Sequence, residues 1–86
     1  MSDGFDYVAD KSVLEIFCKC TKRDREELLR IFQHLAHAPA QRGDYVQRCS
    51  GGRELQVKRF GKWLITFWPD HAVKEMRVVD LKRLAP

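Results

Sequence analysis

A six-residue segment in the C-terminal half constrains the fold more than any other part of the sequence. Residues 63–68 read Trp-Leu-Ile-Thr-Phe-Trp, a run of high β propensity with apolar residues at both odd and even positions. A strand that is apolar on both faces is typical of the centre of a sheet. Just before it, Phe60-Gly61-Lys62-Trp63 places glycine first in a two-residue loop, as a type II′ turn requires. The sequence therefore predicts a β-hairpin whose second strand is central.

Alternating side chains predict further strands around this hairpin. Leu55 and Val57 point one way, while Glu54, Gln56 and Lys58 point the other, which is the period of a strand. The other expected segments are a short first strand at 5–8, a short strand or irregular edge at 45–49, a turn at 50–52, a turn at 69–71 and a last strand at 76–81.

The N-terminal half has the spacing of helices. Apolar residues recur three and four positions apart between residues 13 and 36. Ser12 lies three residues before Glu15, as in a capping box, and Thr21 lies three residues before Asp24, as in a second N-cap. Pro39 ends the pattern. We expect two helices that break near Thr21, with one bent helix over residues 11–37 as the alternative.

The chain length and these elements define the fold class. A length of 86 residues allows one compact domain and excludes a multidomain enzyme with its own cofactor fold. The expected order is strand, helix, helix and a three-stranded meander. Two helices with apolar stripes must cover one face of a small, mostly antiparallel sheet, so we assign residues 1–86 to a single α+β domain.

Charge and composition indicate the cellular location of the protein and the class of partner that it binds. No apolar run approaches the roughly 20 residues that cross a bilayer, and the N-terminus is acidic, so we expect no membrane span, no signal peptide and a cytoplasmic location. The three cysteines fit reduced thiols. Residues 1–41 carry a net charge of −1 and residues 42–86 a net charge of +5. A polyanionic partner should therefore meet the C-terminal half.

Metal and nucleotide sites are poorly supported. Cys18 and Cys20 lie two residues apart on a predicted helix and point about 200° apart, whereas zinc sites usually place at least two residues between cysteines. His34 and His37 share a helix face, but we interpret them as surface residues. Residues 50–53 lack the strand, lysine and helix of a phosphate-binding loop. We expect no metal and no cofactor.

The basic residues of the predicted sheet are the most informative set. Lys58 would project onto an exposed, concave sheet face if the helices cover the other face. Clustered cations bind phosphates and stabilise the charge of a phosphoryl-transfer transition state without a metal. A solvated sheet face without function is the alternative. The candidate catalytic residues are Lys58, Lys62 and Arg83, and the candidate RNA-binding residues are Arg53, Arg59, Arg77 and Lys82.

Nearly the whole chain resembles the RelE/ParE superfamily of small bacterial toxins from toxin–antitoxin modules. The resemblance is carried by the helix from Asp24 to Ala36 before Pro39, by the basic strand, glycine turn and apolar strand of residues 52–68, and by the last strand of residues 76–83. It implies a RelE-like order of β-α-α-β-β-β and a cognate antitoxin that blocks the toxin.

The resemblance also implies a choice between two activities. One is ribosome-dependent, metal-independent cleavage of mRNA (RelE-like), which inhibits translation, and the other is non-catalytic binding of a protein such as gyrase (ParE-like). Lys58 and Arg83 match basic positions of the ribonuclease branch. Gln56 and Trp63 stand where a lysine and an arginine are expected, and no tyrosine follows the last strand. A third reading is a small RNA-binding domain unrelated to toxins.

Large apolar side chains exceed what a three-stranded sheet needs. We expect part of this surface to contact the antitoxin, with burial in the core as the alternative. The candidate partner-binding residues are Trp63, Phe67, Trp68 and Leu81.

Overall fold

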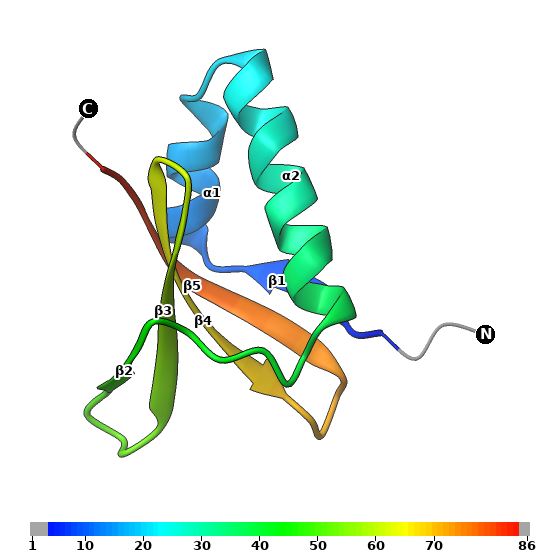
Figure 1. Cartoon of the computed structure of the whole chain (residues 1–86), viewed down its shortest axis with the longest axis vertical. Coiled ribbons are helices and arrows are strands. Elements are labelled where there is room, and N and C mark those ends of the chain that lie inside the picture. The colour runs from blue at the N-terminus through cyan, green and yellow to red at the C-terminus, as the bar shows by residue number, and fades with distance from the viewer. Residues whose placement is uncertain (1–3, 85–86) are drawn as a thin grey trace.

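A five-stranded sheet with the strand order β1-β5-β4-β3-β2 carries two helices on one face (Figure 1). The computed structural model describes residues 4–84. The elements in chain order are β1 (Asp6–Ala9), α1 (Lys11–Cys18), α2 (Lys22–His37), β2 (Tyr45–Arg48), β3 (Glu54–Phe60), β4 (Trp63–Asp70) and β5 (Glu75–Arg83). β1 pairs with β5 in parallel, and the other pairings are antiparallel. The predicted α+β class is confirmed.

The predicted hairpin and its central strand are also confirmed. β3 and β4 are joined at Gly61 and Lys62, with Phe60 opposite Trp63. Gly61 has a φ of 60°, whereas Lys62 is not among the residues with positive φ, as a type II′ turn requires. β4 is the middle strand of the five. β4 carries apolar side chains on both of its faces. The helices cover one face, and Trp68 lies on the other.

Two separate helices form, as expected, but only one of the two predicted caps is present. The Thr21 hydroxyl accepts the backbone N–H of Asp24 at 3.2 Å, which starts α2. The capping box at Ser12 is wrong, because Asp10 is the N-cap of α1 and no side chain caps it. The backbone explains this start: the Asp10 N–H bonds to the carbonyl of Val78 on β5, so pairing of the sheet fixes where the helix begins.

The end of β4 differs from the sequence prediction. Residues 69–71 were expected to turn, yet Pro69 pairs with Met76 and Asp70 pairs with Glu75 on β5. Pro69 lies beyond Phe67, the last residue of β4 that pairs with β3, so its missing N–H interrupts no pairing with β3. The turn instead spans residues 71–74, where Lys74 has a φ of 55°. The segment that was left open between strand and irregular edge is the edge strand β2.

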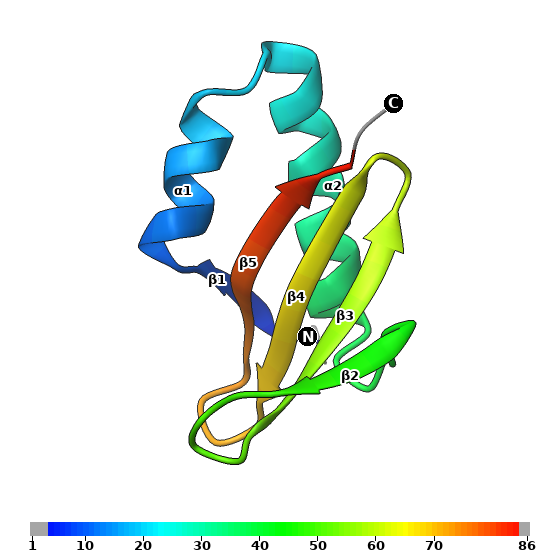
Figure 2. The same ribbon diagram turned by 90° about the vertical axis from the view of Figure 1, so that its left-hand side faces the viewer.

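The hydrophobic core lies between the sheet and the helices. α1 packs against β5, and α2 packs against β1 and β5, while β2 lies away from both helices (Figures 1 and 2). No helix among residues 4–84 has the length and hydropathy needed to span a bilayer. The core residues are Val13, Leu28, Phe32, Leu35, Ala36, Trp63, Ile65, Phe67, Met76, Val78 and Leu81.

Candidate nucleic-acid interface

The sheet face turned away from the helices, here called the open face, gathers the candidate RNA-binding side chains. Paired residues of neighbouring strands point to the same side of a sheet. Ile65 and Leu81 are paired core residues, so the alternate pairs of β4 and β5 point to the open face. Leu64 pairs with Lys82 and Trp68 pairs with Arg77, which places both cations there. In Figure 2 the sheet lies in front of α2, and this face is turned towards the viewer.

The end of the open face next to the hairpin is basic. Arg59, Leu64 and Lys82 form one cross-strand row, here called the hairpin-end row. The Arg59 backbone N–H donates to Asp44 Oδ2 at 2.9 Å, and its side-chain Nε donates to the carbonyl of Gly61 at 2.8 Å. These bonds hold the guanidinium beside the hairpin. Among the described residues, neither Arg59 nor Lys82 forms an ion pair, so both charges remain available to a ligand.

A tryptophan between two arginines occupies the middle of the open face. The guanidinium carbon of Arg53 lies 3.8 Å from the ring centroid of Trp68, and that of Arg77 lies 5.9 Å from it. Arg77 also forms ion pairs with Asp70 (3.5 Å) and Glu75 (3.1 Å). All four candidate RNA-binding residues therefore lie on the open face, Arg53 by its contact with Trp68 and the other three by strand register.

The end of the open face away from the hairpin is acidic. Asp6 pairs with Glu75, and Glu75 pairs with Asp70, which gives a row of three carboxylates, here called the turn-end row. Arg77 in the neighbouring row neutralises part of this charge through its two ion pairs. The open face is thus polarised along its strands, with cations at the hairpin end and carboxylates at the opposite end.

The candidate catalytic residues are not brought onto the open face. Lys58 pairs with Ile65, so it projects to the helix side, where its Nζ lies 5.4 Å from the Phe60 ring centroid. This corrects the expectation that Lys58 lies on the exposed, concave face. The reason is the register of the hairpin: Phe60 pairs with the buried Trp63, and Lys58 has the same parity as Phe60. Arg59, its neighbour, points the other way.

The other two candidates meet at a buried carboxylate instead. Lys62 Nζ lies 2.6 Å from Asp24 Oδ1, and Arg83 Nη1 lies 2.9 Å from Asp24 Oδ2. Asp24 is 4% exposed. The hydrogen bond from Lys62 is the main cause that holds the Asp24 pKa below its ordinary value, while burial opposes the shift and Arg83 adds to it. The two ion pairs thus connect the hairpin turn and the end of β5 to the first turn of α2.

This three-residue cluster predicts an acid-sensitive contribution to stability. The pKa of Asp24 is lower in the folded than in the unfolded chain, so the unfolded state takes up the proton first and stability falls as pH falls. We expect Asp24→Asn to lower the urea midpoint at pH 7, and the difference from wild type to shrink below about pH 4. Glu15→Gln, at an exposed position of α1, is the control. Equal wild-type and Asp24→Asn midpoints at pH 7 would contradict the prediction.

Three of the four candidate partner-binding residues are interior. Trp63, Phe67 and Leu81 are at most 1% exposed, because they face the helices in the core. A partner cannot touch them without unfolding the domain, so the alternative of core burial holds for these three. Trp68 alone lies on the open face and is half-buried.

Two polar residues of the open face were missed by the sequence analysis. Tyr45 and Asp80 belong to one cross-strand row with Val57 and Thr66, directly beside the hairpin-end row. Asp80 lies two positions before Lys82 on β5 and was recognisable from strand period alone. Tyr45 depends on the pairing of β2 with β3, which the sequence left undecided.

A metal site or a reactive thiol has little support within residues 4–84. No three His, Cys, Asp or Glu side chains lie close enough together there to hold a metal ion. Cys18, Cys20 and Cys49 are free thiols. The backbone N–H of Gly51 is the main cause that lowers the pKa of the exposed Cys49 thiol, and burial is the main cause that raises the pKa of Cys20.

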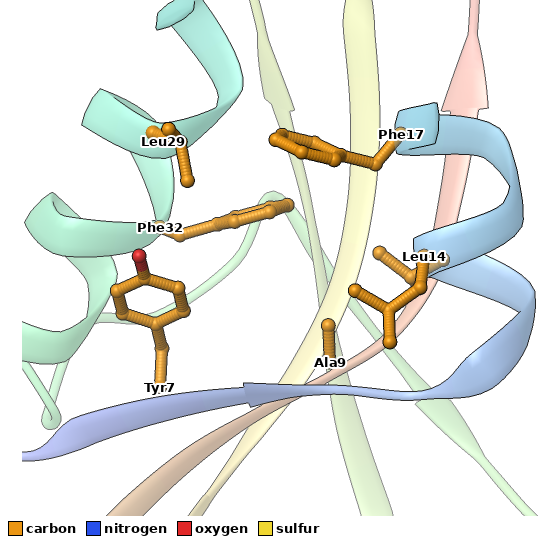
Figure 3. A pocket seen from close by; sticks show the side chains of 7 residues that line it. Tyr7, Ala9, Leu14, Phe17, Leu29 and Phe32 are labelled. Carbon is orange, nitrogen blue, oxygen red and sulfur yellow. The ribbon is translucent and has the colours of Figure 1, made fainter. Parts of the chain in front are cut away.

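An apolar pocket of about 230 Å3 opens on the helix side, between β1, α1 and α2 (Figure 3). Figure 3 shows Leu14 and Phe17 of α1 facing Leu29 and Phe32 of α2, with Tyr7 below Phe32. Leu14 is 50% exposed and Leu29 is 38% exposed, so the pocket is bordered by accessible apolar side chains. It lies on the opposite side of the sheet from the cations of the open face.

Comparison with solved structures finds the same fold in chains of two RelE–RelB-type complexes. The structure superposes on a chain of the toxin–antitoxin complex RelBE2 from Mycobacterium tuberculosis with a TM-score of 0.76 and 11% identity, covering 93% of this chain and 98% of that chain. A chain of the archaeal RelE–RelB complex from Pyrococcus horikoshii OT3 gives a TM-score of 0.69 and 17% identity, covering 96% of each chain.

The sequence comparisons add no relative to these. No family model matches the chain, and no curated protein matches it. At 11% and 17% identity, the two structures establish the fold, and the predicted RelE-like architecture is confirmed.

Proposed function

We propose that this chain, which has the fold of RelE toxins, is the toxin of a toxin–antitoxin module and acts on RNA through the open face. The observation that supports this most strongly is the placement of Arg53, Arg59, Arg77 and Lys82 on one uncovered sheet face. One solved structure with this fold is the toxin–antitoxin complex RelBE2, and another is the archaeal RelE–RelB complex. The site is cationic and lies on a face that the helices leave free, which suits a polyanionic ligand.

The hairpin-end row is the best position for the scissile phosphate. Arg59 and Lys82 lie on either side of β4, two strand spacings or about 10 Å apart at the backbone. Both side chains are long enough to reach one phosphate held over Leu64. Two cations there would stabilise the additional negative charge of a pentacoordinate phosphorus, without a metal.

Asp80 completes a mechanism for RNA cleavage. In the proposed step, the ribose 2′-hydroxyl attacks the adjacent phosphorus and gives its proton to Asp80, which lies one row from Lys82. The bond between phosphorus and the 5′ oxygen then breaks as solvent protonates the leaving oxygen. The products are a 2′,3′-cyclic phosphate and a 5′-hydroxyl. The ribosome would supply the positioned mRNA, as in the RelE-like interpretation.

A non-catalytic, ParE-like role is the second candidate. It is favoured by Trp63, which stands where the resemblance to the ribonuclease branch leads us to expect an arginine and which is 1% exposed. A buried indole cannot clamp a phosphate. Under this alternative the open face would bind a protein such as gyrase, and RNA would remain intact.

Induced expression separates these functions. We expect growth arrest, relief of the arrest by co-expression of the reading frame adjacent to this gene, and new mRNA 5′ ends within codons by primer extension. A purified translation reaction should show the same ends only when ribosomes are present. Growth arrest with intact mRNA would exclude the ribonuclease and favour the ParE-like role, whereas absence of growth arrest would count against a toxin.

A further inference from the structure

Trp68 and its two arginines form an aromatic site that the cleavage step does not use. The indole lies between Arg53 on the β3 side and Arg77 on the β5 side, at 3.8 and 5.9 Å from the ring centroid. Trp68 is only half-buried, although it is one of the largest side chains of the chain. A large aromatic ring on an uncovered face offers a surface on which a planar group can stack.

The two arginines are held differently. Arg77 is fixed by ion pairs to Asp70 and Glu75 and by its cross-strand position opposite Trp68. Arg53 is exposed, precedes β3, and forms no ion pair within residues 4–84, so its contact with the indole holds it. An exposed cation–π contact is weak, so a better stacking partner can replace it. A ligand can therefore displace Arg53 from the indole, whereas Arg77 remains held by its ion pairs.

The charge around Trp68 selects a neutral ligand group. Asp6, Asp70 and Glu75 form the turn-end row, one row beyond Trp68. A phosphate placed here would meet these carboxylates, whereas an uncharged planar base would not be repelled. Phosphates are favoured four residues away along β4, in the hairpin-end row with Arg59 and Lys82.

We propose that Trp68 is the stacking site for one base of a single-stranded RNA whose backbone is held at Arg59 and Lys82. The inference rests on the proposed function, since it concerns the same RNA. Leu64 and Trp68 are four residues apart on one strand, or about 13 Å, which an extended RNA spans with two nucleotides. The base displaces Arg53 from the indole, and the freed guanidinium becomes available to the phosphate of that nucleotide.

Fluorescence anisotropy tests this with two probes of equal length. The first is a fluorescein-labelled hexamer of adenylate with 2′-O-methyl riboses, which cannot be cleaved, and the second has the same backbone without bases. For the base-containing probe we expect Trp68→Ala to weaken binding by about tenfold and Trp68→Phe by less than about threefold. The probe without bases should bind wild type and Trp68→Ala equally.

Salt dependence and tryptophan emission give two further readouts. Stacking releases no counterions, so Trp68→Ala should leave the slope of log K against log salt unchanged, while Arg59→Ala lowers it by about 0.7. In the free protein, Arg53→Ala should increase acrylamide quenching of Trp68. Arg48→Ala, a matched removal of an exposed arginine ion-paired to Glu54, should not. The buried Trp63 serves as an internal reference.

The outcomes separate this inference from the proposed function. If Arg59→Ala and Lys82→Ala weaken both probes while Trp68→Ala weakens neither, RNA binding stands and the stacking site is wrong. If Trp68→Ala weakens both probes equally, or lowers the salt slope, base stacking is also wrong. If neither probe binds wild type, both proposals fail. Loss of antitoxin binding with unchanged RNA binding would assign Trp68 to the protein partner and overturn the inference.

Discussion

Trp63→Ala should remove a large part of the stability of the fold and lower its urea midpoint. Trp63 is 1% exposed and packs in the core where β3, β4 and β5 meet the helices. Truncating a buried tryptophan costs about 3–5 kcal/mol, whereas a domain of this size is stable by roughly 4–13 kcal/mol in total. Urea unfolding followed by far-UV circular dichroism measures the loss.

Trp63→Phe is the control for this substitution. Phenylalanine keeps most of the buried volume and removes an indole N–H that has no hydrogen-bond partner within the described residues. The loss of apolar area is therefore partly offset, and we expect a cost of less than about 1.5 kcal/mol. A Trp63→Ala variant with a wild-type urea midpoint would contradict the assignment of Trp63 to the core.

The same burial predicts that an arginine cannot be restored here by one substitution. Trp63→Arg places a charge among Phe67, Leu28 and the other core residues, so we expect unfolding and no gain of ribonuclease activity. The proposed cleavage therefore uses cations of the open face, chiefly Arg59 and Lys82.

The second large effect concerns those two cations. We expect Arg59→Ala and Lys82→Ala each to weaken RNA binding by at least about tenfold, because each charge-assisted contact to phosphate is worth about 1.5–3 kcal/mol. Both side chains lie in one row, where the proposed site holds one phosphate, so the double variant should lose at least about 100-fold and no longer arrest growth. Fold stability should change little, since neither side chain forms an ion pair among residues 4–84 and the hydrogen bond from Arg59 Nε to the Gly61 carbonyl is exposed.

A matched double variant controls for charge. Arg48→Ala with Lys74→Ala removes the same two charges from exposed positions outside the hairpin-end row, and should leave growth arrest intact. Lys58→Ala tests the residue favoured by sequence, and we expect a smaller effect because Lys58 projects to the helix side. Full growth arrest by the Arg59→Ala, Lys82→Ala variant would remove the hairpin-end row as the site.

Local sequence signals were sufficient to predict the helices and most of the strands. They were not sufficient to predict which side chains of a strand point to which face of the sheet. Glycine at the first loop position predicted the hairpin, and Thr21 predicted the break between the helices. The face of β3 was misassigned because Leu55 and Val57 were taken as the core side. Val57 is 1% exposed, yet it pairs with Thr66 on the open face. Counting back from the two-residue turn would have placed Lys58 opposite Ile65.

Long-range pairing explains the rest of what sequence could not provide. Asp24 was recognised as a residue of the α2 cap, but its ion pairs join residues 38 and 59 positions away along the chain. Such contacts depend on how α2 crosses the sheet, so no short-range pattern in the sequence indicates them. Strand period therefore places Arg59, Arg77 and Lys82 on the open face, whereas the positions of the Lys62 and Arg83 side chains depend on a distant carboxylate.

The position of β5 has a consequence for biosynthesis. This strand is the last element along the chain, yet it lies between β1 and β4 and contributes Met76, Val78 and Leu81 to the core. During translation β1 and both helices leave the ribosome before β5, the strand with which β1 pairs and against which α1 and part of α2 pack. The domain can complete its fold only after Arg83 has emerged, so a nascent chain stalled before β5 would present neither a closed core nor an ordered open face.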